Sequence, residues 1–266
     1  MKTTVYGSTG PLVVKLAGIT GGVRLYDEEV EAVASAGFRV VALDVTGDRH
    51  DDPAKQPLDW DSYAREVVDA IQGTQADRAI LWGTSFGGMI ALATAARHAG
   101  RVSGLLLTHP PDPLRRRRLF VELLDFAERR ADPDLAVRVM FTTAFLGLTS
   151  WEPISPALSM RLPSLARAAL EAATPASTVR RKLGLLFHDD PGLPPPAAAI
   201  PVEVVAGAWD LVAPRAGALR LAARIPGARV HVLGYSGHAG AFARPRAHIR
   251  FVIEALRRLA PRPTAA

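Results

Sequence analysis

A repeated alternation between short, almost continuously apolar runs and segments with helical spacing constrains the fold of this chain most strongly. Runs such as Phe38–Leu43 and Val102–Thr108 are apolar at successive positions rather than at every second one. A strand of this kind must be covered on both faces. We therefore predict an α/β fold whose mostly parallel central sheet carries helices on both faces. The predicted strands are residues 11–16, 38–43, 78–82, 102–108, 202–206 and 229–233, and the helices between and after them are 25–36, 63–72, 89–98, 214–223 and 245–259.

The alternation stops between residues 113 and 196, where the chain has helical spacing and no convincing strand. Prolines cluster on both sides of this stretch, near residues 110–113 and at 194–196. A chain of 266 residues has room for one core domain with an insertion. We predict a core formed by residues 1–112 and 197–266, with a helical cap, residues 113–196, inserted into it. The helices expected in this cap are 119–129, 133–146, 163–173 and 178–187.

The composition excludes several kinds of chemistry. The chain has no cysteine, which rules out disulfides, thiolate catalysis and cysteine-based zinc sites. Its glycine-rich stretches, residues 7–10 and 18–22, lack the Lys-Ser/Thr pair of a phosphate-binding loop. We therefore expect neither a cofactor nor a metal.

The charge and the N-terminal residues bear on the localisation of the protein and on its binding partners. Residues 1–12 do not resemble a signal peptide, and no run approaches the roughly 18 apolar residues of a membrane span. The net charge is +6, but the basic cluster Arg115–Arg118 has no interleaved aromatic residues and is more typical of a solvated helix start than of a nucleic-acid surface. The strong preference for arginine over lysine is typical of a GC-rich bacterial genome. We expect a cytoplasmic bacterial protein whose partner is a small-molecule substrate, with no nucleic acid or membrane, and we keep a homodimer open.

A G-x-S-x-G motif, Gly83–Gly87, is the most informative short pattern in the chain. An apolar strand leads into it and an alanine-rich helix follows it, which is the setting that a nucleophilic serine on a sharp turn requires. Side chains at either glycine would collide with the neighbouring strand or helix. We therefore predict that Ser85 is a nucleophile, with the N-terminus of the following helix aimed at it.

A serine nucleophile needs a general base, and the base needs an acid that orients it. Asp210 and His238 follow the last two predicted strands, in the chain order Ser, Asp, His. We assign Asp210 as the acid and His238 as the base. Asp112, which follows an earlier strand, is the alternative acid, and His50 and His109 also follow strands and stay open as pocket residues.

Two backbone N–H groups are expected to bind the oxyanion of the reaction. One is that of Phe86, directly after the serine, and the other lies in the loop 17–22, where Ile19 is the first choice and Thr20 the second. The cap is rich in apolar residues, and any one of them is more easily explained by packing than by substrate contact. The residues that we nevertheless expect to contact a mostly apolar substrate are Thr20, Phe141, Phe145 and Trp151.

Together these residues resemble the α/β-hydrolase superfamily, and the resemblance covers nearly the whole chain except the variable cap. Gly237-His238 followed by Pro245 is similar to the family's histidine loop, whereas Ala17-Gly18 replaces the His-Gly common in its oxyanion loop. The N-terminal segment is short, so we expect the family's first antiparallel strands to be reduced. The resemblance implies a serine hydrolase that cleaves an ester, lactone or thioester. Two alternatives stay open: carbon–carbon hydrolysis or a non-hydrolytic cyclase or lyase reaction on the same fold, and a binding protein without turnover.

Overall fold

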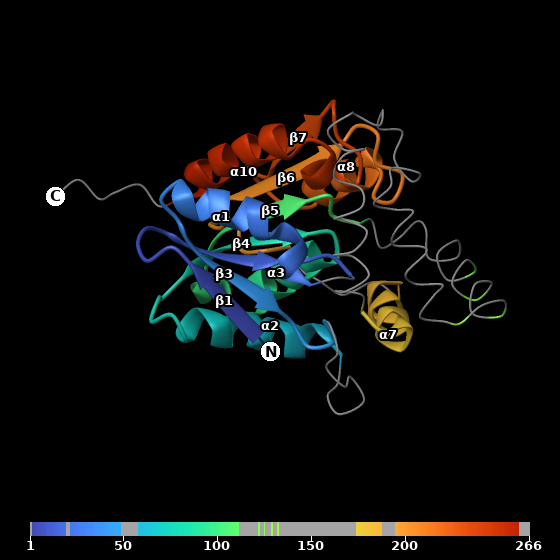
Figure 1. Ribbon diagram of the computed structural model, residues 1–266, viewed down its shortest axis with the longest axis horizontal. Coiled ribbons are helices and arrows are strands. Elements are labelled where there is room, and N and C mark those ends of the chain that lie inside the picture. The colour runs from blue at the N-terminus through green and yellow to red at the C-terminus, as the bar shows by residue number, and fades with distance from the viewer. Residues whose placement is uncertain are drawn as a thin grey trace.

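The computed structural model describes residues 2–19, 22–48, 58–111, 174–187 and 195–260, together with positions 122, 125, 129 and 132. These residues form a seven-stranded sheet in the order β1-β3-β2-β4-β5-β6-β7, and every neighbouring pair except β1 and β3 is parallel. The predicted mostly parallel sheet is therefore confirmed (Figure 1). The strands are β1 (Lys2–Tyr6), β2 (Leu12–Leu16), β3 (Arg39–Asp44), β4 (Ala79–Thr84), β5 (Val102–Thr108), β6 (Val202–Gly207) and β7 (Arg229–Leu233).

Helices cover both faces of the sheet, as the uniformly buried central strands require. One apolar cluster joins the sheet to α1, α9 and α10, and a second joins its other face to α2, α3, α7 and α8. The helices are η1 (Val23–Tyr26), α1 (Asp27–Ser35), α2 (Trp60–Gln72), α3 (Phe86–Arg97), η3 (Ala99–Arg101), α7 (Ala176–Phe187), α8 (Arg215–Ala223), α9 (Gly240–Ala243) and α10 (Pro245–Leu259).

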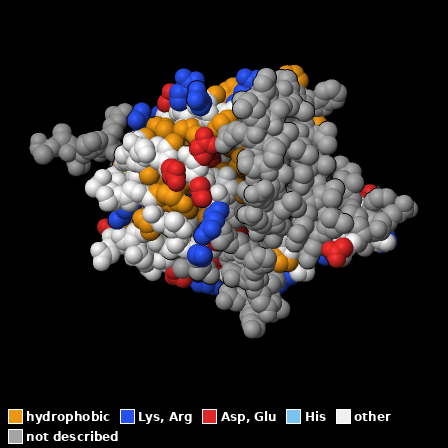
Figure 2. Space-filling view, in the orientation of Figure 1, with side chains coloured by type: hydrophobic (Ala, Val, Ile, Leu, Met, Phe, Trp, Pro, Cys, Tyr) orange, Lys and Arg blue, Asp and Glu red, His pale blue; other side chains and the backbone are white. Residues whose placement is uncertain are grey.

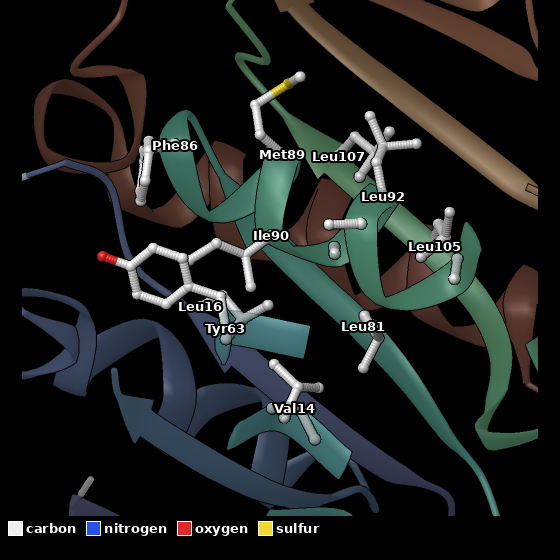
Figure 3. Packing of buried hydrophobic residues seen from close by; sticks show 14 of the residues in the cluster. Val14, Leu16, Tyr63, Leu81, Phe86, Met89, Ile90, Leu92, Leu105 and Leu107 are labelled. Atoms are coloured by element: carbon white, nitrogen blue, oxygen red, sulfur yellow. The ribbon is translucent and has the colours of Figure 1, made fainter. Parts of the chain in front are cut away.

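The helix that follows the predicted nucleophile, α3, is buried on most of its surface, because it lies between the sheet and α2. In Figure 3, Met89 and Leu92 lie beside Leu107 of β5, whereas Ile90 lies beside Tyr63 of α2. Alanine and glycine dominate its other positions, which lets α3 approach its neighbours closely. This packing holds the start of α3 in a fixed place against the ends of the strands.

The parallel strands end at a common edge of the sheet, and the register aligns their last residues. Thr84 of β4 is paired with Thr108 of β5, which is in turn paired with Val205 of β6. Residues that directly follow these strands therefore emerge next to one another. The predicted nucleophile, acid and base, Ser85, Asp210 and His238, each follow a strand at this edge.

The N-terminal part of the sheet is reduced, as expected. Its single antiparallel strand, β1, pairs with β3 and does not form a hairpin with β2. The first helical turn after β2 is also tighter than expected, since a 3₁₀ turn, η1, precedes α1. Helices α2, α3, α8 and α10 lie within three residues of their predicted bounds, whereas the short η3 and α9 were not predicted.

Most of the predicted cap, residues 113–196, lies outside the described residues, so its domain boundaries stay a prediction. Its last predicted helix is described as α7, which begins two residues earlier than expected. Lys182 of α7 and Asp48, which follows β3, form a fully buried ion pair. This pair ties α7 to the edge of the sheet where the predicted site residues lie.

Two observations concern the length of the helices and the distribution of charge on the surface. Among the residues that are described, no helix combines the length and the apolar character needed to cross a bilayer. On the face shown in Figure 2, acidic and basic side chains lie close together between hydrophobic patches.

Candidate active site

Ser85 sits on a sharp turn between β4 and α3. Its backbone has a φ of 53° and a ψ of −117°, a conformation that non-glycine residues rarely adopt. The Ser85 N–H donates to the Thr108 carbonyl at 2.8 Å, so the adjacent strand holds the turn in place. Strain of this kind persists only where the surroundings enforce it, and it is concentrated at functional sites.

The two glycines of the motif are explained by close backbone contacts. A Cβ at Gly83 would lie 2.3 Å from the Gly87 carbonyl oxygen, and one at Gly87 would lie 2.4 Å from the Ala17 carbonyl oxygen. Both distances are far below a van der Waals contact, and both involve backbone that cannot rotate away. The turn that exposes Ser85 therefore requires glycine at both positions.

Asp210 and His238, separated by 28 residues in the chain, meet at the same edge of the sheet. His238 Nδ1 lies 2.9 Å from Asp210 Oδ2, and because an ionised carboxylate can only accept, the imidazole donates from Nδ1. The other carboxylate oxygen accepts the backbone N–H groups of Val212 at 2.9 Å and Ala213 at 2.7 Å. The ring is thereby held in the tautomer whose Nε2 is free to accept a proton.

The electrostatics of this pair match that arrangement. Burial on its own would raise the pKa of Asp210, but the His238 charge and the hydrogen bonds from His109 and His238 hold that pKa well below its usual range. For His238, burial lowers the pKa, yet the neighbouring carboxylate more than compensates and the pKa lies above its ordinary value. Asp210 is therefore a carboxylate at neutral pH, with a stabilising effect on a protonated His238.

A second histidine, His109, bonds to the same carboxylate oxygen. Its Nδ1 lies 3.0 Å from Asp210 Oδ2, and its side chain is 2% exposed. Sequence reasoning left His109 open as a pocket residue and did not include it among the site residues. The available signal was its position directly after β5, between the strands that precede Ser85 and Asp210.

The predicted oxyanion donors lie beside the serine. Phe86 is the first residue of α3, where a backbone N–H has no partner within the helix. Its buried ring packs against Trp60 and Tyr63, with ring centroids 5.5 and 5.7 Å apart. A Cβ on Gly18 would lie 3.8 Å from Ser85 Cβ, which places the loop that carries Ile19 next to the serine.

Several residues that the sequence analysis named lie outside the described residues. They are the expected substrate contacts Thr20, Phe141, Phe145 and Trp151. The alternative acid Asp112 and the pocket candidate His50 also lie there, so Asp210 is the one of the two acids whose contacts are described.

A buried polar cluster that the sequence did not indicate lies beneath the serine turn. Lys15, in an otherwise apolar strand, donates from Nζ to Thr84 Oγ1 at 2.6 Å and lies 3.8 Å from the Trp82 ring centroid. Its Nζ is 3.9 Å from a carboxylate oxygen of Glu29, whose other oxygen is 3.3 Å from Nε2 of His248. Burial lowers the pKa of Lys15 to about 8 and raises that of Glu29 to about 7.

His109, Asp210 and His238 each place one ligand atom within 4.8 Å of the others, a combination that a divalent transition metal can use. However, Oδ2 of Asp210 already accepts both Nδ1–H groups, and a ring nitrogen that carries a proton cannot bind a metal. The contacts at Nδ1 are therefore those of a hydrogen-bonded group, and a metal ion bound through these two nitrogens would have to displace both protons.

Comparisons with known proteins agree with the fold. The model of the alpha/beta hydrolase fold family matches residues 11–245. The AB hydrolase superfamily protein YisY of Bacillus subtilis is 28% identical over 86% of this chain and 85% of its own. The pimeloyl-[acyl-carrier protein] methyl ester esterase of Aromatoleum aromaticum is 31% identical over 66% of this chain and 73% of its own. The crystal structure of the enol-lactonase from Burkholderia xenovorans superimposes with a TM-score of 0.79 and 22% identity, covering 96% of each chain.

Proposed function

Since the chain belongs to the alpha/beta hydrolase fold family and is a hydrolase of that fold, we propose that it is a serine hydrolase acting on a carboxylic ester, lactone or thioester. The observation that carries the proposal is the Asp210–His238 hydrogen bond at the sheet edge where Ser85 occupies its strained turn. The relative and the neighbour named as a methyl ester esterase and an enol-lactonase support an ester or lactone carbonyl as the target.

In the proposed reaction, Ser85 Oγ attacks the carbonyl carbon while His238 Nε2 accepts the serine proton. The backbone N–H groups of Phe86 and Ile19 bind the oxyanion that forms. His238 then gives the proton to the leaving group, which departs and leaves an acyl-enzyme. Water attacks the acyl group by the same route, with His238 again taking and returning the proton, and Asp210 stabilises the imidazolium in each half of the reaction.

We further propose a mostly apolar substrate of small to medium size, bound between the sheet edge and a helical cap. The proposal is supported by the apolar character of residues 113–196 and by α7, whose buried side chains join the core beside Asp48. Thr20, Phe141, Phe145 and Trp151 are the proposed contacts. No cofactor, nucleic acid or membrane takes part in this scheme, which is that of a cytoplasmic enzyme.

The first test is the intact mass of the protein after treatment with a fluorophosphonate probe. We expect one adduct on the wild type and none on Ser85→Ala. Ser62→Ala, which removes a half-buried serine on α2, is the matched control and should be labelled like the wild type. If the folded wild type forms no adduct, Ser85 is not an activated nucleophile, and the alternative of a binding protein without turnover is favoured.

Product analysis then separates the remaining alternatives. Hydrolysis of esters, lactones or thioesters incorporates one oxygen from water into the acid product, which mass spectrometry in ¹⁸O-water detects. A cleaved carbon–carbon bond, or an isomerised product without ¹⁸O, would instead indicate the carbon–carbon hydrolase or the cyclase and lyase readings.

A further inference from the structure

Asp210 is contacted by two imidazoles, although a base needs only one to be oriented. His109 and His238 both place Nδ1 about the same distance from Oδ2, at 3.0 and 2.9 Å. Their ring centroids are 5.7 Å apart at an interplanar angle of 71°. A carboxylate oxygen has two lone-pair directions, so two donors fill Oδ2 completely. His109 therefore leaves one direction open, and His238 occupies it.

His109 is fixed in this position by its backbone and its surroundings. Its φ is 52°, in the left-handed region, and its N–H donates to the Val205 carbonyl of β6 at 2.7 Å. The preceding residue, Thr108, accepts the Ser85 N–H at 2.8 Å. Two successive residues at the end of β5 thus contact the backbone of the proposed nucleophile and the side chain of the proposed acid.

The surroundings of His109 exclude direct contact with a substrate. Its side chain is 2% exposed, and its ring lies over His248 of α10 with centroids 6.0 Å apart and an interplanar angle of 18°. Within the described part of the chain, His109 Nε2 has no hydrogen-bond partner. His248 contacts Glu29 of α1, which pairs with Lys15 of β2, and Lys15 lies over the ring of Tyr26. Among the described residues, these groups and His248, with Asp210 and His238, are the titratable groups at this end of the site.

We propose that His109 is a positioning residue for the proposed hydrolase: its Nδ1–H orients the Asp210 carboxylate and thereby fixes the direction from which His238 approaches. The proposal depends on the proposed function for its kinetic consequences, whereas the hydrogen bond can be measured without any activity. The His109 N–H also offsets part of the negative charge on Asp210. Asp210 therefore stabilises the protonated form of His238 less strongly than it would without His109.

Two variants separate the effect of losing the hydrogen-bond donor from the effect of losing the volume of the His109 ring. In His109→Asn, Nδ2 stands where Nδ1 stands in histidine, and asparagine tolerates a positive φ. His109→Leu keeps much of the volume and has no donor. We expect His109→Leu to lower kcat about 10- to 100-fold with little change in KM, because a hydrogen bond to a charged group is lost. His109→Asn should stay within about threefold of the wild type.

The pH profile supplies a readout that a merely structural role would not change. Without the second donor, Asp210 keeps more negative charge and holds the proton on His238 more strongly. The acidic limb of kcat/KM should therefore move to higher pH, by about one unit, in His109→Leu and stay in place in His109→Asn. Thermal unfolding of each variant shows whether it is folded at the assay temperature.

Nitrogen-15 spectra of protein labelled at histidine decide the question even if the protein hydrolyses nothing. We expect the wild type to carry protons on Nδ1 of both His109 and His238, and His109→Leu to remove one set of signals and shift the other. Failure of fluorophosphonate labelling in the wild type would count against the proposed function alone. The positioning role is overturned by an unprotonated Nδ1 on His109, by a folded His109→Leu with the kcat and pH profile of the wild type, or by equal losses in the leucine and asparagine variants.

Discussion

Replacing Asp210 by asparagine tests the acid assignment, because the change alters hydrogen bonding and leaves size almost unchanged. Oδ1 accepts two backbone N–H groups, from Val212 and Ala213, and Oδ2 accepts two imidazole N–H groups. All four neighbours are donors, so a carboxylate satisfies both ends. An asparagine amide has only one accepting end, and its NH₂ group must face two donors in either orientation.

The structure indicates which pair of donors loses its acceptor in Asp210→Asn. Backbone amides cannot change their protonation, so the amide oxygen should stay with Val212 and Ala213, and the NH₂ group should face the histidines. His238 then has to accept at Nδ1 and carry its proton on Nε2, where it can no longer take the proton of Ser85. For a base in the wrong tautomer, kcat falls on the order of 10⁴-fold, or about 5.4 kcal/mol of transition-state stabilisation.

The assay is kcat for short 4-nitrophenyl esters, measured with the wild type and Asp210→Asn at one pH. Asp61→Asn is the matched control, because Asp61 is an exposed carboxylate paired with Arg97 on the surface and should leave kcat unchanged. Unfolding should show a loss of only about 1–3 kcal/mol for Asp210→Asn. If the folded variant keeps more than about a tenth of the wild-type kcat, the reasoning is refuted, and Asp112 becomes the better acid.

Three further predictions follow from particular contacts. The kcat/KM profile should fall on the acidic side with a midpoint above pH 6.5. Activity needs neutral His238, and its carboxylate partner raises the pKa of that ring above 6.5. A midpoint below pH 6.5 in a pH–rate series would contradict this. Lys182→Met should destabilise the protein by about 3–5 kcal/mol in urea unfolding, because it leaves the Asp48 carboxyl buried without its partner. A second change of Asp48 to leucine should restore part of the loss, and no recovery in the double variant would count against the pair. Gly87→Ala should yield little folded protein in a solubility and circular dichroism assay. Gly184→Ala, where a Cβ meets no described atom within 4 Å, should raise stability by about 0.5–1 kcal/mol, and equal tolerance of both changes would contradict the steric argument.

Local chemistry explains why much of this protein could be predicted from its sequence. The central strands are buried on both faces, so their apolar runs had no alternative to a covered parallel sheet. The G-x-S-x-G turn could be recognised because it lies in one strand–turn–helix unit. Gly83 is required by backbone contacts within that unit, whereas Gly87 is required by the backbone of Leu16 and Ala17 at the end of β2. Ser85, Asp210 and His238 could be chosen because each lies in the loop that follows a strand, and parallel strands end at one edge.

Other features depended on which strands are neighbours and how side chains turn, and these were decided only by the tertiary structure. His109 follows β5, but its contact with Asp210 requires β5 to lie beside β6 and its backbone to adopt a positive φ. Lys15 stands in a strand that reads as apolar, and its charge is accommodated by Thr84, Glu29 and two aromatic rings from distant segments. The Lys182–Asp48 pair joins residues 134 positions apart. Buried polar contacts of this kind leave no periodic trace in a sequence, because each partner is selected by a single long-range contact rather than by a repeated face.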